Sequence, residues 1–297
     1  MSTLPANHHA SLHHDQLMAC DTHVHVIGAS SHYPMVVERQ YTPGTASTAD
    51  LQQHLERQAM RRVIVVQPSV YGTDNRCLLD ALDAMPQQAR GVAVCDPQVP
   101  QTELQQLDAR GVRGLRLNLE SSSNHNPQAL MDALRFWAPR IAELGWHLQV
   151  YAPFAVTAAC ASVIAQLPVP VVLDHFALWP QHAQGADTPP HVRDILQLLI
   201  DGHIYIKLSA SYRSPAYAPE ALTQLAHRLL QTRPDRLLWG SDWPHTNRDP
   251  GLTPHQVSRY RPIDPEQLRN ERQAWLNNSA WQQCVLVDNP QRLYRFN

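Results

Sequence analysis

Eight short apolar segments recur along the chain, and each is followed by enough residues for a helix. Each segment is short and rich in Val, Ile or Leu, as buried strands are. They cover residues 17–26, 61–69, 89–97, 111–119, 145–152, 169–176, 203–210 and 236–244. The pattern predicts eight β-strands.

The segments between these strands show helical periodicity. In residues 127–145 the apolar side chains that recur at helical spacing are Leu130, Leu134, Trp137 and Ile141. The same pattern marks residues 48–60, 190–202 and 218–231. Strands that alternate with helices favour parallel pairing with right-handed crossovers. Because there are eight such units and no GxGxxG after the first strand, we predict the α/β class and a single (β/α)8 TIM-like barrel.

The chain ends are expected to lie outside this repeat. Residues 1–15 are polar and rich in histidine, which predicts a flexible leader ahead of a barrel domain over residues 16–297. Residues 264–296 predict two extra C-terminal helices, which we expect to pack over the outer wall of the barrel.

Composition narrows the class of protein. Of the 297 residues, 43% are hydrophobic and 17% charged, and the formal net charge is −2. This balance is typical of a globular protein and predicts binding to neither nucleic acid nor a membrane. We find no long apolar run or signal segment, and the five cysteines form no CxxC pair, so a cytoplasmic protein is expected.

The strand ends carry the candidate chemistry, because barrel enzymes build their sites where the strands end. Polar residues end nearly every predicted strand: His23, His25, Gln67, Ser69, Arg116, Asn118, Tyr151, Asp174, His175, Lys207, Ser209, Ser241 and Asp242. Burial of so many polar groups at one rim destabilises a fold unless they are paired or used. By strand alternation, we expect Asp21, His23 and His25 to share one face.

Four of these residues suit hydrolysis. His23, His25, His175 and Asp242 are ligand types for a divalent metal such as zinc, and the same groups can work without one. In both cases Asp242 can act as general base on water, while the histidines, or a metal that they hold, polarise a carbonyl.

The chain resembles the amidohydrolase superfamily, in particular the amidohydrolase-2 branch that includes 2-pyrone-4,6-dicarboxylate lactonase and sugar lactonases. The resemblance rests on "DTHVH", "LDHF", "KLS", "WGSDWPHT" and "NPQRLYRF", which occur in this order over most of the chain. It implies hydrolysis of a lactone by water that Asp242 activates, with His23, His25 and His175 at the carbonyl. Tyr151 stands where many superfamily members have a metal-binding histidine, which resembles the lactonases that need no metal.

The resemblance also implies contacts to substrate carboxylates from Tyr41, Ser69, Arg116, Tyr151 and Arg213, and we add Lys207 and His245 to this predicted set. Arginine suits the role because its planar fork binds both carboxylate oxygens. Two basic positions of the pyrone lactonase are missing, in "LESSSNHN" and "FALWP". A less anionic substrate, such as a monocarboxylate or sugar lactone, is therefore as well supported as the pyrone.

Two alternatives remain open. One is a metal-dependent decarboxylase of an aromatic or muconate-like acid, which requires a tightly held metal. The other is a barrel without catalytic activity that binds a small acid. The expected partner is in every case a small molecule, and self-association into a homo-oligomer is compatible with the sequence.

Overall fold

The structure is a computed structural model that describes residues 18–120, 125–181, 189–214 and 216–296. The predicted leader lies outside these residues. Eight strands form one parallel sheet in the order β1-β3-β4-β5-β6-β7-β8-β9. They are β1 (Cys20–Val24), β3 (Arg62–Val66), β4 (Ala89–Ala93), β5 (Val112–Asn118), β6 (His147–Tyr151), β7 (Val171–Leu173), β8 (Ile204–Ser209) and β9 (Leu237–Gly240). All eight lie within the segments that the sequence predicts.

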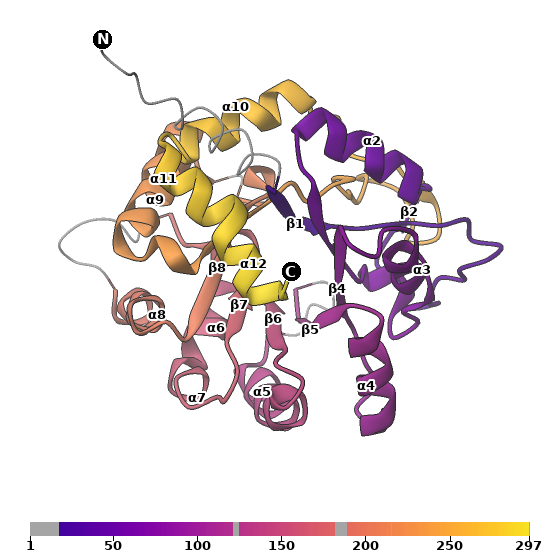
Figure 1. Ribbon diagram of the computed structural model, residues 1–297, viewed down its shortest axis with the longest axis horizontal. Coiled ribbons are helices and arrows are strands. Elements are labelled where there is room, and N and C mark those ends of the chain that lie inside the picture. The colour runs from indigo at the N-terminus through magenta and orange to yellow at the C-terminus, as the bar shows by residue number, and fades with distance from the viewer. Residues whose placement is uncertain (1–17, 121–124, 182–188, 215, 297) are drawn as a thin grey trace, which may run out of the picture.

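The two edge strands of this sheet meet just beyond the end of β9. The amide of Asp242 donates to the carbonyl of His23 at 2.9 Å, and the amide of His25 donates to the carbonyl of Trp243 at 2.8 Å. Val24 and Trp243 also form a parallel bridge. The sheet is therefore a nearly closed barrel, which confirms the predicted (β/α)8 class (Figure 1).

Helices surround the strands in Figure 1. They are α2 (Thr48–Gln58), α3 (Arg76–Ala84), α4 (Gln101–Ala109), α5 (Pro127–Ala142), α6 (Phe154–Ala159), α7 (Ala161–Ile164), α8 (Pro190–Asp201) and α9 (Pro219–Thr232). The first turns follow known capping rules. Ser47 and Asp50 form a reciprocal capping box at α2, and Asn126 caps α5 ahead of Pro127. No helix in the part of the chain that the structure describes is long and apolar enough to span a membrane.

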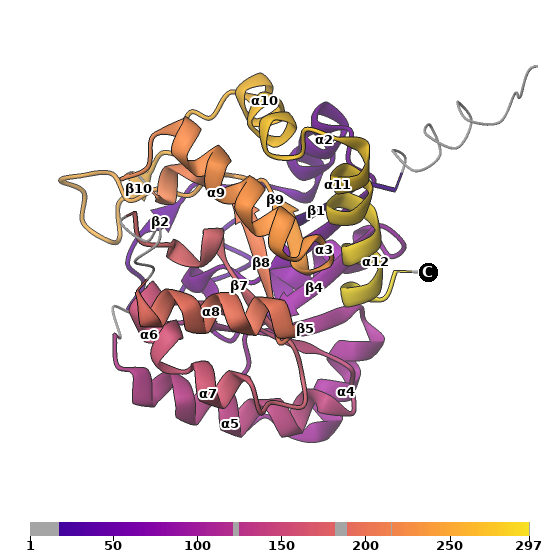
Figure 2. The same cartoon turned by 90° about the vertical axis from the view of Figure 1, so that its left-hand side faces the viewer.

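The C-terminal segment differs in part from the prediction. It consists of α10 (Pro265–Trp275), α11 (Ser279–Gln283), a π-helical turn η5 (Cys284–Asp288) and α12 (Asn289–Tyr294). Helix α10 lies on the outer wall, where Gln58 of α2 donates to the carbonyl of Pro265. Helix α12 instead covers the end of the barrel opposite the β2–β10 loops, as Figure 2 shows.

Aromatic side chains explain why α12 leaves the outer wall. Tyr294 is fully buried, and Phe296 lies under the guanidinium groups of Arg62 and Arg90, each 4.8 Å from its ring centroid. These aromatic rings and Leu293 of α12 join an apolar cluster with residues of the strands: Cys20, Ile64, Val66, Val92, Val172, Tyr205 and Leu238. One end of the barrel is thus closed by apolar packing, and the polar strand ends occupy the other.

Two further features frame the barrel. A short parallel pair of β2 (Thr42–Pro43) and β10 (Val257–Ser258) joins the loops that follow β1 and β9.

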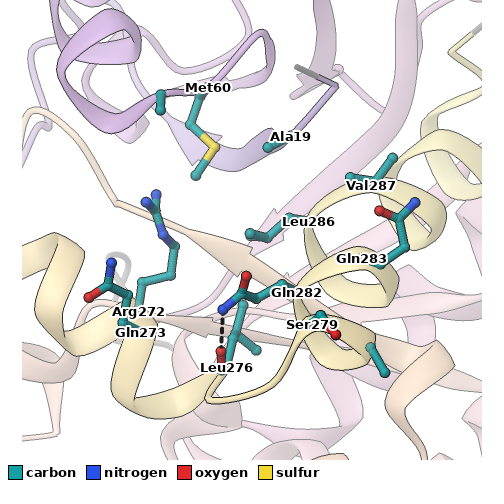
Figure 3. Close-up of a pocket in the computed structure, with 12 residues that line it drawn as sticks. Ala19, Met60, Arg272, Gln273, Leu276, Ser279, Gln282, Gln283, Leu286 and Val287 are labelled. Carbon is teal, nitrogen blue, oxygen red and sulfur yellow. Dashed lines mark hydrogen bonds between the residues drawn. The ribbon is translucent and has the colours of Figure 1, made fainter. Parts of the chain in front are cut away.

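A cavity of about 480 Å³ lies between the start of β1 and α10–α11, where Met60, Arg272 and Leu276 line it (Figure 3). The residues that line this cavity do not include the polar residues of the strand ends.

Candidate active site

Four side chains from strands that are far apart in sequence converge above the barrel. The Nε2 atoms of His23 and His25 each lie 3.6 Å from Oδ1 of Asp242, and Nε2 of His175 lies 4.0 Å from it. His23 and Asp242 are fully buried, and the other two imidazoles are at most 5% exposed. The structure therefore brings together all four residues that the sequence predicts as catalytic.

Close backbone packing between β1 and β9 positions this cluster. A Cβ atom at Gly240 would lie 2.6 Å from Cβ of His23, so only glycine fits there. The backbones of His175 and Asp242 have φ values of 51° and 60°, in the left-handed region that non-glycine residues seldom adopt. Strain of this kind at a polar rim is typical of a functional site.

The other ring nitrogens fix the orientation of the imidazoles. Nδ1 of His25 lies 2.8 Å from the carbonyl of Val66, and Nδ1 of His175 lies 2.9 Å from the hydroxyl of Ser209. Because a carbonyl only accepts, neutral His25 carries its proton on Nδ1. Its Nε2 lone pair therefore faces the carboxylate of Asp242.

This arrangement fits a metal ion. Two hydrogen-bond acceptors face each other at 3.6 Å, and the buried atoms His23 Nε2 and Asp242 Oδ1 have no hydrogen-bond partner among the described residues. Two ligands about 2.0–2.1 Å from a tetrahedral zinc lie roughly 3.3 Å apart, close to these separations. The ligand atoms of His23, His25 and Asp242 lie within 4.8 Å of one another, as do those of His23, Asp174 and His175. The residues present could therefore hold a divalent cation.

The second carboxylate oxygen of Asp242, Oδ2, is bound by two side chains outside the histidine cluster. Oδ2 accepts a hydrogen bond from the Tyr212 hydroxyl at 2.6 Å and pairs with Nη2 of Arg213 at 2.7 Å. Both residues belong to the 3₁₀ turn η3 (Ser211–Arg213), which follows β8. Burial raises the pKa of Asp242, but Arg213 and then His175 outweigh this effect and hold that pKa well below its usual range. Asp242 is thus ionised.

A buried polar network lies beneath the cluster. Asp174 contacts three cationic or imidazole groups: His23 Nδ1 at 3.3 Å, Arg116 Nη2 at 3.4 Å and Lys207 Nζ at 3.6 Å. Gln149 donates to Asp174 and accepts from Lys207, at 3.1 and 2.8 Å. The network compensates the charges that burial would otherwise leave unpaired.

The imidazoles of His23 and His175 are neutral in this environment. Burial lowers the pKa of His175 to about 3, although Asp242 acts in the opposite direction. Burial likewise holds the pKa of His23 well below its usual range despite the neighbouring Asp174. Burial lowers the pKa of Lys207 to about 8, again against Asp174. Neutral imidazoles are the form that binds metals.

A small cavity of about 50 Å³ opens above the cluster. The residues that line it include five of the predicted substrate contacts, namely Tyr41, Ser69, Arg116, Tyr151 and Arg213. Two wider cavities of about 310 and 420 Å³ share some of these residues, and continue the space outwards. The side chains that the resemblance implied are therefore gathered around one space.

Two predicted contacts lie elsewhere. Lys207 is fully buried in the network below, and His245 is 7% exposed and packs beside the rings of His54 and Tyr212. Neither lines the small cavity above the cluster. A direct contact of either residue with substrate stays a prediction. Their positions fit better with a role in holding the residues of the cluster than with a contact to substrate.

The expectation for Asp21 is wrong. Its register with β3 breaks between Asp21 and Val24, so the simple alternation of faces fails. Asp21 accepts from the amide of Ser241 at 2.9 Å and lies 3.5 Å from Nε2 of His54 on α2. Asp21 thus links β1 to Ser241 and to α2, and it contacts His23 through the backbone amide, which donates to Oδ1 at 3.2 Å.

Sequence reasoning also missed two side chains that contact the cluster. Asp174 stood among the strand ends without a role, although the pair "DH" was a usable signal. Tyr212 lies in a loop, where no periodicity indicates direction, and only the structure shows its hydroxyl on Asp242.

The structure is a parallel barrel with three histidines and an aspartate at its strand ends, beneath a cavity lined by two arginines. This fold and this site are typical of a hydrolase. The chain belongs to the Amidohydrolase family, whose model matches residues 20–296.

Named relatives are similar to this chain over most of its length. The chain is 33% identical over 292 residues to a 2-pyrone-4,6-dicarboxylate hydrolase of Comamonas testosteroni, covering 93% of this chain and 90% of the relative. It is also 33% identical over 284 residues to a 4-sulfomuconolactone hydrolase of Rhizobium radiobacter, covering 93% and 89%. A crystal structure of a probable 2-pyrone-4,6-dicarboxylic acid hydrolase from Acinetobacter baumannii, with citric acid bound, superposes with a TM-score of 0.77. That protein is 26% identical, and the match covers 94% of this chain and 99% of the other.

Proposed function

We propose that this protein is a hydrolase that opens the lactone ring of a small carboxylated substrate, with Asp242 as the base that activates water. One observation carries the proposal: Oδ1 of Asp242 has no hydrogen-bond partner among the described residues and is faced by three imidazole Nε2 atoms. The relatives named as lactone hydrolases support the same reaction class.

The chemistry follows from the two oxygens of Asp242. Tyr212 and Arg213 bind Oδ2, which leaves Oδ1 to accept a proton from water. The resulting hydroxide adds to the lactone carbonyl, and the ring C–O bond then breaks. The ring oxygen takes the proton back from Asp242, so that the base is restored and the product carries a new carboxylate.

His23, His25, His175 and Asp242 would hold a divalent cation such as zinc, which would polarise the carbonyl and lower the pKa of water. In its absence, an imidazole could assist only when its Nε2 carries a proton. The orientation of His25 on Val66 disfavours that role for neutral His25, since its proton lies on Nδ1.

Substrate charge is recognised above the cluster. Arg116 and Arg213 both line the cavity of about 50 Å³, together with the hydroxyl-bearing side chains of Tyr41, Ser69 and Tyr151. Two cations in this space match a substrate with one or two anionic groups. The relatives are named for a dicarboxylate and a sulfonated lactone, both anionic compounds.

The test is a lactone screen on the purified protein with its metal content measured. The panel contains 2-pyrone-4,6-dicarboxylate, 4-sulfomuconolactone, a monocarboxylated pyrone and a sugar lactone, each assayed before and after chelation. We expect ring opening of at least one anionic lactone. Release of carbon dioxide without ring opening would support a decarboxylase instead, and binding without either reaction would support the barrel that only binds acids. The cytoplasm stays the predicted location.

A further inference from the structure

Arg213 both binds the carboxylate of Asp242 and borders the cavity above the cluster. Its Nη2 and Nε atoms both bind Oδ2 of Asp242, at 2.7 and 2.8 Å. The same guanidinium borders the cavity in which a substrate anion would lie. In the free protein, the cation for substrate recognition is thus already paired with the base.

We propose that Arg213 is a specificity-determining switch, which leaves Asp242 for the anionic group of the substrate and thereby frees the base, while Tyr212 keeps holding Oδ2. This inference rests on the proposed lactone hydrolysis. The switch would make the enzyme select anionic substrates through kcat as well as through binding. A neutral lactone has no anionic group to bind Arg213, so Arg213 stays on Asp242.

The surroundings of the two residues differ as the switch requires. The Arg213 side chain is 20% exposed, and Asp242 is fully buried. Arg213 lines the small cavity above the cluster and the wider one of about 310 Å³. It also has a second acceptor in reach, since Nη2 lies 3.2 Å from the hydroxyl of Thr246. The guanidinium can therefore turn towards the cavity without losing all its partners.

Tyr212 contacts Arg213, whose guanidinium lies 5.5 Å from the centroid of the Tyr212 ring, but it lines a different cavity. It borders a separate cavity of about 220 Å³ between η3 and α10, and does not line the small cavity above the cluster. Its ring is held by the guanidinium of Arg261, 5.1 Å from the ring centroid, and by the ring of His245 at 6.1 Å. A phenol held in this way can keep Oδ2 in place while Arg213 moves.

Ion-pair exchange makes the step energetically feasible. A substrate carboxylate replaces the carboxylate of Asp242 on Arg213, so one charge-assisted contact forms as another breaks. Asp242 then retains Tyr212 and the three imidazoles but loses its cation. A carboxylate without a paired cation is the stronger base, which accelerates proton transfer.

The kinetic test uses 2-pyrone and 2-pyrone-6-carboxylate, which share a ring and differ in charge. Arg213→Met should raise kcat for the neutral lactone by about threefold to thirtyfold, as loss of a paired cation strengthens the base. The same variant should lower kcat for the carboxylated lactone at least about tenfold. A fall for both lactones would overturn the switch.

Two control variants sharpen this result. Arg110→Met removes a cation that pairs with Asp83 at 2.5 Å, away from the cavities above the cluster, so it should not raise the neutral rate. A rise with Arg110→Met as large as that with Arg213→Met would attribute the effect to overall charge and overturn the proposal. Tyr212→Phe should lower kcat for both lactones with little change in KM, and an increase for the neutral lactone would also contradict it.

A crystal structure of the unmodified protein with citrate separates this inference from the proposed function. We expect a citrate carboxylate on Arg213 and a distance beyond 4 Å between Arg213 Nη2 and Asp242 Oδ2. An intact Arg213–Asp242 pair beside bound citrate, or no citrate on Arg213 at saturation, would overturn the switch. This result holds even if the lactone screen finds no substrate, an outcome that counts against the function alone.

Discussion

Replacement of Asp242 by asparagine tests the role of the base, because the two side chains have nearly the same shape. The amide oxygen can keep the hydrogen bond from Tyr212, now 2.6 Å long, and the amide nitrogen can face the lone pairs of the histidines. The variant should therefore fold. Loss of the charged partner of Arg213 should lower the free energy of unfolding by about 1.5 to 3 kcal/mol.

The expected effect on catalysis is much larger. A positioned general base contributes about 10²- to 10⁴-fold, which corresponds to roughly 2.7 to 5.5 kcal/mol in the activation barrier. We expect kcat of Asp242→Asn, measured by the loss of lactone absorbance, to fall at least about 10²-fold. Binding of the product, measured by calorimetry, should persist. Asp235→Asn is the matched control, since Asp235 pairs with Arg233 in the turn before β9. A kcat within tenfold of the unmodified enzyme would refute the role of Asp242 as base.

Three other perturbations give distinct readouts. Arg116→Met should raise KM for carboxylated lactones roughly tenfold to a hundredfold, from the loss of one charge-assisted contact; an unchanged KM would remove Arg116 from substrate binding. Gly240→Ala should lower the unfolding temperature, because its Cβ would lie 2.6 Å from that of His23 and overpacking costs about 1–3 kcal/mol; equal melting curves would refute this. The pKa values of His147 and His175, lowered by burial to about 3, keep both neutral when folded, whereas the unfolded chain gains protons below about pH 6.5. The free energy of unfolding should therefore fall by about 2 kcal/mol per imidazole from pH 7 to 5 in urea titrations, and a flat profile would contradict these pKa values.

The sequence was sufficient to predict the barrel, because each strand has a distinct run of branched apolar residues and each helix an apolar face. The position of α12 across one end of the barrel was not predictable from periodicity. Tyr294 and Phe296 are apolar residues at the end of a helix, and the sequence pattern does not indicate which surface they cover. Strand alternation failed for Asp21 because it assumes an unbroken register, and β1 has an irregular one.

For the site, the polar strand ends were informative because parallel strands all end at the same rim. Which oxygen of Asp242 is free, however, depends on Tyr212 and Arg213, in a turn without periodic constraint. The neutral state of His23 and His175 depends on burial, which outweighs the neighbouring carboxylates and which sequence alone does not reveal.

The central claim is hydrolysis of a lactone by water, and isotope incorporation tests it most directly. The purified protein is incubated with 2-pyrone-4,6-dicarboxylate or the best lactone of the screen in water enriched in heavy oxygen, and the product is analysed by mass spectrometry. The account predicts a ring-opened acid that carries one heavy oxygen atom in its new carboxylate, formed by the unmodified enzyme and not by Asp242→Asn. A product without heavy oxygen, or one that has lost carbon dioxide, would contradict it.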